Sequence, residues 1–217
     1  MTLPDVDRRY AAHALADLVR YGGVPLAERY VAHLRAVLAH DGRERGFRAT
    51  RAALRAYYRL MSPKDEFWVA RLLTSPEKFE RDRKRYGIDP ARGDSLSYAF
   101  LVRPRLRLLG RELELPVAAP PWVLRLVASC SFLRTWGRGW NRDDDEFFTW
   151  FLAAVDEAGR DGDYERLVAI LERGADVVGF REVRRRKRDA ARDAIDALRA
   201  VRGRARVEER LASVSAG

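Results

Sequence analysis

Residues 57–73, YYRLMSPKDEFWVARLL, place side chains that could do chemistry among large apolar residues. Lys64, Asp65 and Glu66 are consecutive, and Arg71 follows in the same short segment. Neighbouring carboxylates and cations can act as general acids and bases, or they can pair and hold an interface together. Lys64 and Arg71 are seven residues apart and share roughly one helix face, whereas Glu66 lies off that face. We predict a fixed ion-pair network, formed within the fold or across a subunit boundary.

The same segment also has a purely structural interpretation. Ser62 can cap a helix whose first residue is Pro63, with Asp65 three residues after the cap, as in a capping box. Acidic side chains in a first helical turn are stabilised by the helix dipole. A second Ser-Pro pair, Ser75 and Pro76, opens the following segment in the same way. We therefore interpret the stretch chiefly as a capped structural helix whose charges lock an assembly together.

Histidines and clustered acids are the other side chains with metal-binding chemistry. His33 and His40 are seven residues apart on one helix face, but a metal site would need a third ligand beside them. Asp143, Asp144 and Asp145 could bind a cation, yet three acids also suit the N-terminus of a helix. We expect structural roles for both groups.

Two segments could contact a partner. Trp136 and Trp140 flank glycines in WGRGWN, and they could stack on a base or an aromatic ligand, or anchor the loop to the core. The run RRRKR, residues 184–188, could engage phosphates. Successive helical residues rotate by about 100°, so five of them cannot all face one ligand. We favour loop anchoring for the tryptophans, and a solvated helix that docks a partner for the basic run.

Motifs of the common enzyme classes are absent from the sequence. It has no GxSxG elbow, no GxxxxGK[ST] phosphate loop and no GxGxxG after a strand. The single cysteine, Cys130, excludes an internal disulfide and any cluster or zinc site built from several cysteines of this chain. We predict no catalytic, cofactor-binding or metal-binding residue.

Apolar residues at helical spacing predict a mainly α protein, an orthogonal or bundle-like array of many helices. Residues 94–117 interrupt the pattern, and RLRLLGRELEL within them predicts an irregular or β-hairpin excursion that turns near Gly110. The expected helices cover residues 5–21, 25–41, 47–61, 122–133, 143–158 and 163–173, with others opening at 63, 76 and 181.

Length and composition favour a single helical domain over residues 1–203 with a frayed tail at 204–217. The formal net charge of +10 would suit an acidic partner or nucleic acid. Nearly all the excess is arginine in an Ala-, Leu- and Gly-rich sequence, so solvated basic helix faces explain it as well. No apolar run approaches the roughly 20 residues of a membrane span, and the N-terminus lacks a signal peptide's apolar core. We expect a cytoplasmic protein.

The block LRAYYRLMSPKDEFWVARLLTSPEKF resembles a segment of the helical C-terminal region of indolepyruvate ferredoxin oxidoreductases. That family has a Leu-Met-x-x-Lys-Asp-Glu-aromatic-x-Val-Ala-Arg-Leu-x-Thr pattern. The sequence carries this pattern without gaps in Leu60, Met61, Lys64, Asp65, Glu66, Phe67, Val69, Ala70, Arg71, Leu72 and Thr74.

The resemblance extends over residues 8–200 and includes LRTWGRGWN and DYERLVAILERGADVVGF. The family closes on a Gly-aromatic-Gly-His-Val-Lys motif, of which GFREVRR keeps Gly179, Phe180 and Val183. Arg181 and Glu182 stand where that motif has Gly and His, so any ligand contact of the histidine is lost. Phe180 and Arg181, with Trp136 and Trp140, remain candidate loop contacts.

The resemblance implies an accessory helical module of a 2-oxoacid:ferredoxin oxidoreductase that supports assembly or covers the cofactor cleft of the catalytic subunits. Thiamine diphosphate, magnesium and iron–sulfur clusters would then lie in partner subunits, because this chain has no GDG…N motif and no cysteine cluster. The alternative is a basic helical nucleic-acid-binding protein. A self-sufficient enzyme using the histidines and carboxylates is the third possibility, but nothing in the sequence brings a base and a nucleophile together.

Overall fold

The computed structural model describes residues 5–215 except 97, 99, 103–104, 109–110, 115–116, 120 and 131–141. The side chains of residues 66, 99–121, 181 and 203–215 are also outside the description. The chain divides into two compact units. The first unit comprises Met1–Pro63 with Asn141–Gly217, and the second comprises Lys64–Trp140.

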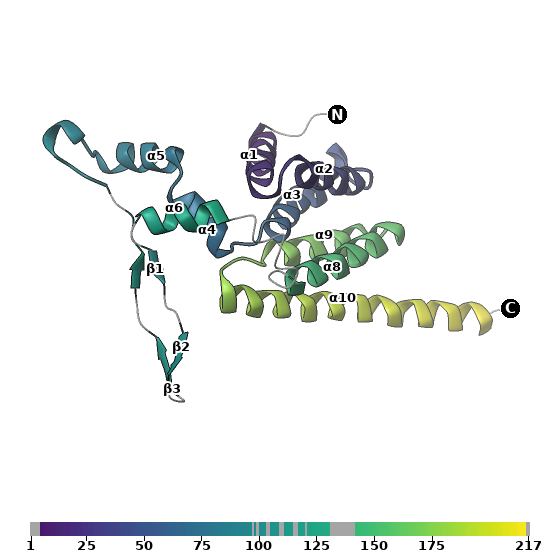
Figure 1. Cartoon of the computed structure of the whole chain (residues 1–217). Coiled ribbons are helices and arrows are strands. Elements are labelled where there is room, and N and C mark those ends of the chain that lie inside the picture. The colour runs from purple at the N-terminus through teal and green to yellow at the C-terminus, as the bar shows by residue number, and fades with distance from the viewer. Residues whose placement is uncertain are drawn as a thin grey trace. The chain divides into compact units, whose positions relative to one another are not determined.

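The first unit is entirely helical in its described part. Helix α3 packs against α9, although more than a hundred residues separate them in the sequence, and it also contacts α1 and α2 (Figure 1). Helices α8 and α10 both pack on α9, and α10 continues past them toward the C-terminus (Figure 1). The helices of this unit are α1 (Asp5–Gly22), α2 (Val24–Leu38), α3 (Arg48–Met61), α8 (Arg142–Arg160), α9 (Tyr164–Ala175) and α10 (Arg181–Ser215), with a 3₁₀ turn at Arg43–Arg45.

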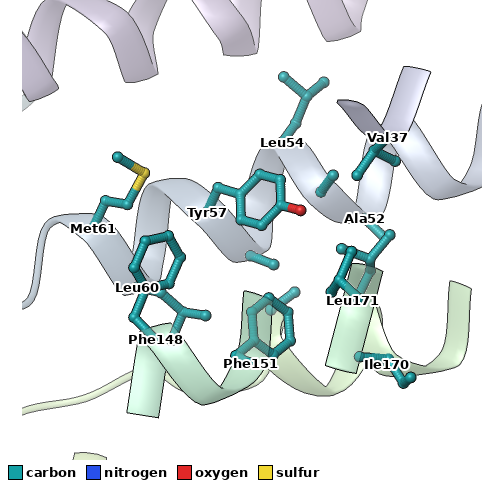
Figure 2. Packing of buried hydrophobic residues seen from close by; sticks show 14 of the residues in the cluster. Val37, Ala52, Leu54, Tyr57, Leu60, Met61, Phe148, Phe151, Ile170 and Leu171 are labelled. Atoms are coloured by element: carbon teal, nitrogen blue, oxygen red, sulfur yellow. The ribbon is translucent and has the colours of Figure 1, made fainter. Parts of the chain in front are cut away.

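The core of the first unit is formed where α3, α8 and α9 meet (Figure 2). Tyr57 of α3 lies edge-on to both Phe148 and Phe151 of α8, with ring centroids 6.2 Å apart in each pair. Leu171 of α9 completes the cluster and is fully buried. Burial of each such side chain contributes about 1.5–3 kcal/mol, so the apolar stripes dictate this helix arrangement.

The second unit contains α4 (Glu66–Leu73), α5 (Pro76–Tyr86) and α6 (Pro121–Ser129), with a 3₁₀ turn at Pro90–Arg92. Helices α4 and α6 pack together through Ala70 and Leu124. Between α5 and α6 the chain forms two antiparallel strand pairs. Strand β1 (Phe100–Val102) pairs with β4 (Val117–Ala119), and β2 (Arg105–Leu108) pairs with β3 (Arg111–Glu114).

The structure confirms the mainly helical fold and the β excursion near residues 94–117. Strands β2 and β3 pair antiparallel with Leu108 opposite Arg111, and the expected turn residue Gly110 lies outside the described residues. Helix α10 reaches Ser215 and therefore includes most of the segment expected to be a frayed tail. The single domain over residues 1–203 stays a prediction. The division into two compact units, near residues 63 and 141, was not expected from the sequence.

Within the described residues, no helix has the length and apolar character needed to cross a membrane.

Candidate functional site

The predicted charge cluster lies at the start of α4. Lys64 and Arg71 are exposed, and Asp65 is buried with 4 % of its surface accessible. The Asp65 carboxylate accepts a hydrogen bond from the Trp68 backbone N–H at 2.7 Å, so Asp65 is the N-cap of α4. Glu66 is the first residue of the helix, and its side chain is outside the description. The ion-pair network proposed for these residues stays a prediction.

The expected capping box at Ser62 is wrong. Ser62 is instead the C-cap of α3, and its hydroxyl donates to the Tyr58 carbonyl at 2.6 Å. The chain continues without helix through residue 65, because Asp65 itself offers the acceptor that the first turn needs. The second Ser-Pro device is confirmed, since the Ser75 hydroxyl accepts from the Lys78 N–H at 3.2 Å and Pro76 is the first residue of α5.

Of the four candidate loop contacts, two lie among the described residues. Trp136 and Trp140 lie outside the described residues. Phe180 is half-buried just before α10, and Arg181 is the first residue of α10 with its side chain not described. The proposed contacts of these four residues are therefore predictions.

The basic run at residues 184–188 is divided between two helix faces, as the helical rotation predicted. Arg184 and Arg188 turn toward the N-terminus of α8, where the Arg184 Nε lies 3.1 Å from both carboxylate oxygens of Asp144. Arg188 pairs with Asp143 at 3.3 Å. On the exposed face, Arg185 and Arg186 both pair with Glu182 of the same helix. Asp143 and Asp144 therefore neutralise Arg184 and Arg188, whereas Glu182 is the partner of Arg185 and Arg186.

His33 and His40 line one hollow of about 360 Å³, but only His33 lies on α2, because the helix ends at Leu38 and His40 follows in the turn, so the predicted shared helix face is wrong. His33 packs against the rings of Tyr57 and Phe148, at centroid distances of 5.5 and 5.6 Å. Burial and the nearby Arg29 lower the pKa of His33 below its usual value of 6.5, and Asp156 opposes the shift. The histidine is therefore neutral at physiological pH and behaves as a packing residue.

The other polar side chains of this hollow are a carboxylate, a phenol and a guanidinium. Asp156, Tyr57 and Arg160 also line it, and burial raises the pKa of Tyr57 well above its usual range. Among the described residues, neither His33 nor His40 has a hydrogen bond to a carboxylate or hydroxyl that would make a base–nucleophile pair. The described part of the chain also contains no group of three His, Cys, Asp or Glu side chains placed to hold a metal ion.

Asp41 organises a polar cluster that the sequence analysis missed. Its Oδ2 accepts hydrogen bonds from the Thr50 N–H and hydroxyl, both at 2.8 Å. Its Oδ1 accepts from the Gly42 N–H at 2.8 Å and from the Tyr164 hydroxyl of α9 at 3.0 Å. Because Phe47, at the N-cap position of α3, offers no side-chain acceptor, Asp41 supplies the cap from six residues upstream. The cluster joins α3 to α9, and no local motif reveals the pairing with Tyr164.

A groove lined by arginines lies between α3 and the end of α9, with a volume of about 470 Å³. Glu172 and Asp176 also line it. The signal for this surface is visible in the sequence, because four of the arginines follow a 3-4-4 spacing along one helix face. The arginine groove is defined by Arg48, Arg51, Arg55 and Arg59 of α3 and Arg173 of α9.

Residues 8–197 match the model of one protein family, DUF6537, described as a family of unknown function. No curated protein and no solved structure matches the chain.

Proposed function

The chain belongs to the DUF6537 family, and from this premise we propose that it is a non-catalytic accessory subunit or domain of a thiamine-dependent 2-oxoacid:ferredoxin oxidoreductase. In this role it supports assembly, or covers the cofactor cleft, of catalytic subunits that act on indolepyruvate or another 2-oxoacid. The resemblance described above supplies the enzyme class.

The observation that supports an accessory role is the position of the residues that carry the resemblance. Leu60 and Met61 of the pattern are buried at the end of α3. Phe67 and Ala70 are buried in α4, and Asp65 caps that helix. The residues of this block thus form the core contacts and the cap of two helices. These are structural roles, as expected for an accessory subunit.

Partner subunits hold the cofactors in this proposal. A cysteine-ligated iron–sulfur cluster needs several thiolates, and the chain has only Cys130, which is half-buried. The residues present therefore do not fit such a cluster, and no step of a reaction is assigned to them. A cytoplasmic location belongs to the same proposal, because ferredoxin-linked enzymes and a lone thiol suit a reducing compartment.

Co-purification from the native host tests the proposal. The tagged full chain is expected to retain partner subunits that contain thiamine diphosphate and oxidise a 2-oxoacid with a ferredoxin or viologen acceptor. Lys64→Glu with Arg71→Glu places two negative charges on the exposed face of the cluster, and we expect it to reduce the amount of partner retained. Arg35→Glu with Arg43→Glu makes the same charge change at two other exposed positions and serves as the control.

Two results would contradict the proposal. Recovery of the chain from its host as a monomer with no thiamine-containing partner removes the accessory role. Turnover of a 2-oxoacid by the isolated, metal-free chain shows that it is itself the catalyst.

Nucleic-acid binding is the alternative, and its support is the net charge of +10. The pairing of Arg184, Arg185, Arg186 and Arg188 with carboxylates weakens its main sequence argument. Retention on DNA whose affinity falls steeply with salt would favour the alternative, and no binding at low salt would remove it.

A further inference from the structure

The arginine groove concentrates like charges on one face of α3. Arg51, Arg55 and Arg59 are spaced by four residues, so they follow one another along the helix surface about 6 Å apart. Like charges at this spacing repel each other, and they are retained at a stability cost unless something neutralises them.

Some of these arginines are already neutralised inside the first unit. Arg51 pairs with the buried Asp7 of α1 at 2.7 Å. Arg48 pairs with Glu165 of α9 at 2.8 Å, but both side chains are more than half exposed.

Arg55 and Arg59 differ from Arg48 and Arg51 in their interactions. Arg55 is exposed, and within the described part of the structure its only interaction is with the ring of Tyr10, 5.9 Å from the ring centroid. Arg59 donates a hydrogen bond to the Ala175 carbonyl at the end of α9, which orients the guanidinium without neutralising it. Among the described residues, neither Arg55 nor Arg59 has a carboxylate partner.

We propose that the arginine groove is a docking site for an acidic segment of a partner protein, whose carboxylates bind Arg55 and Arg59. A guanidinium presents a planar pair of N–H donors that matches a carboxylate in bidentate geometry. Alternate side chains of an extended peptide are about 6.6 Å apart, close to the roughly 6 Å repeat of the two arginines. An extended segment with Glu or Asp at every second position therefore fits the row.

The acids of the groove favour a protein over a nucleic acid. Glu172 and Asp176 lie on its α9 side, and Asp176 is 3.8 Å from Arg173. A phosphate backbone carries a uniform negative charge and would be repelled along that side. A polypeptide can place neutral or basic residues there while its acidic side chains face α3. Charge complementarity thus selects a protein segment of mixed composition.

This inference is independent of the proposed function, because it concerns any acidic partner. The probe is a fluorescein-labelled eight-residue peptide of alternating Glu and Ser, and its anisotropy is followed as the isolated full chain is added. Arg55→Gln removes one charge-assisted contact, and we expect it to weaken binding about tenfold. Arg55→Gln with Arg59→Gln is expected to abolish it.

Three comparisons make the experiment decisive. Arg35→Gln with Arg43→Gln removes equal charge from exposed arginines elsewhere on the first unit and is expected to keep binding within about twofold. Arg55→Glu is expected to lose the Glu-Ser peptide and to gain affinity for the corresponding Lys-Ser peptide, which a merely unfolded variant would not do. Thermal melting by circular dichroism confirms that each variant is folded.

The proposal is overturned by any of three results. Equal weakening in the groove and control variants would show that only the net charge matters. Binding of a single-stranded oligonucleotide with equal charge more tightly than the peptide, lost in Arg55→Gln, would assign the groove to nucleic acid. Absence of peptide binding by the unaltered chain at low salt would remove the site.

Discussion

Gly174 of α9 lies directly against the ring of Phe151 of α8, and the missing side chain at 174 lets the two helices come together. A Cβ placed at Gly174 would lie closer than 3 Å to two ring atoms of Phe151 and 3.3 Å from the Cβ of Ala56 in α3. The Phe151 ring is fully buried and cannot swing into solvent. One glycine therefore determines how closely three helices approach.

Gly174→Ala is expected to destabilise the protein by about 1–3 kcal/mol, the usual cost of overpacking a core. The sign is informative, because alanine is intrinsically the better helix former by about 1 kcal/mol. Urea denaturation followed by circular dichroism measures the change. In a Phe151→Leu background, the same substitution should cost less or should stabilise. A stabilising Gly174→Ala in the unaltered chain would show that the helices are not in close contact here.

Asp41→Ala is expected to cost about 2–4 kcal/mol, because it leaves the buried Thr50 N–H and the Tyr164 hydroxyl without their acceptor. Tyr164→Phe removes the hydrogen bond to Asp41 and two longer ones, from the Ala49 N–H at 3.4 Å and to the Arg45 carbonyl at 3.5 Å, and is expected to cost about 1 kcal/mol. Chemical denaturation of the two single variants and the double variant measures the coupling. Additive effects of the two substitutions would mean that Asp41 and Tyr164 do not interact in solution.

Arg184→Ala is expected to destabilise by about 1.5–3 kcal/mol, because Asp144 would keep only Arg188, 3.7 Å away, and the Val177 carbonyl would lose its donor, in a site where the Arg184 side chain is only 8 % exposed. Arg185→Ala and Arg186→Ala are the matched controls in the same basic run, and each should change stability by no more than about 0.5 kcal/mol. Thermal unfolding of the three variants provides the comparison. Similar small effects at all three positions would contradict the assignment of Arg184 to the helix interface.

Protonation of His33 makes stability depend on pH near neutrality. The pKa of His33 is lowered in the folded state by burial and by Arg29, against the opposing effect of Asp156, so the unfolded chain binds the proton more readily. The contribution of neutral His33 to the free energy of unfolding is therefore fully present above the unfolded pKa of about 6.5. It falls as the pH drops from there toward the folded pKa.

The prediction is a loss of stability on acidification between about pH 7.5 and 5.5 that His33→Phe reduces. His13→Gln alters an exposed histidine of α1 and should leave the slope unchanged. Urea midpoints at several pH values measure both. An unchanged slope in His33→Phe would contradict the prediction.

The helix ends show most clearly what the local sequence predicts and what it does not. Ser75 with Pro76 opens α5 and Gly87 ends it at a φ of 63°, as local chemistry predicts. Ser62 with Pro63 is the same pair of residue types, yet the helix begins after Asp65 instead. Asp65, three residues after Ser62, offers a competing acceptor and becomes the N-cap. Residue types alone do not show which of two nearby candidates will cap a helix.

The candidate sites show the same limit. The rotation of the 184–188 run followed from helix geometry, which is local, whereas α2 ends before His40 and the predicted face with His33 does not form. The contacts of Asp41 with Tyr164 and of Arg184 with Asp144 span 123 and 40 residues. No periodicity encodes which distant acid meets which donor.

The sequence by itself determined the mainly helical class, the place of the β excursion and most helix boundaries, because those depend on interactions between residues a few positions apart. Tertiary structure alone decided that α3 packs on α9, that Gly174 fits against Phe151, and that two arginines of one helix face lack carboxylate partners among the described residues. Those outcomes depend on which helices meet, and the meeting of helices is set by burial of the whole apolar surface and not by any single motif.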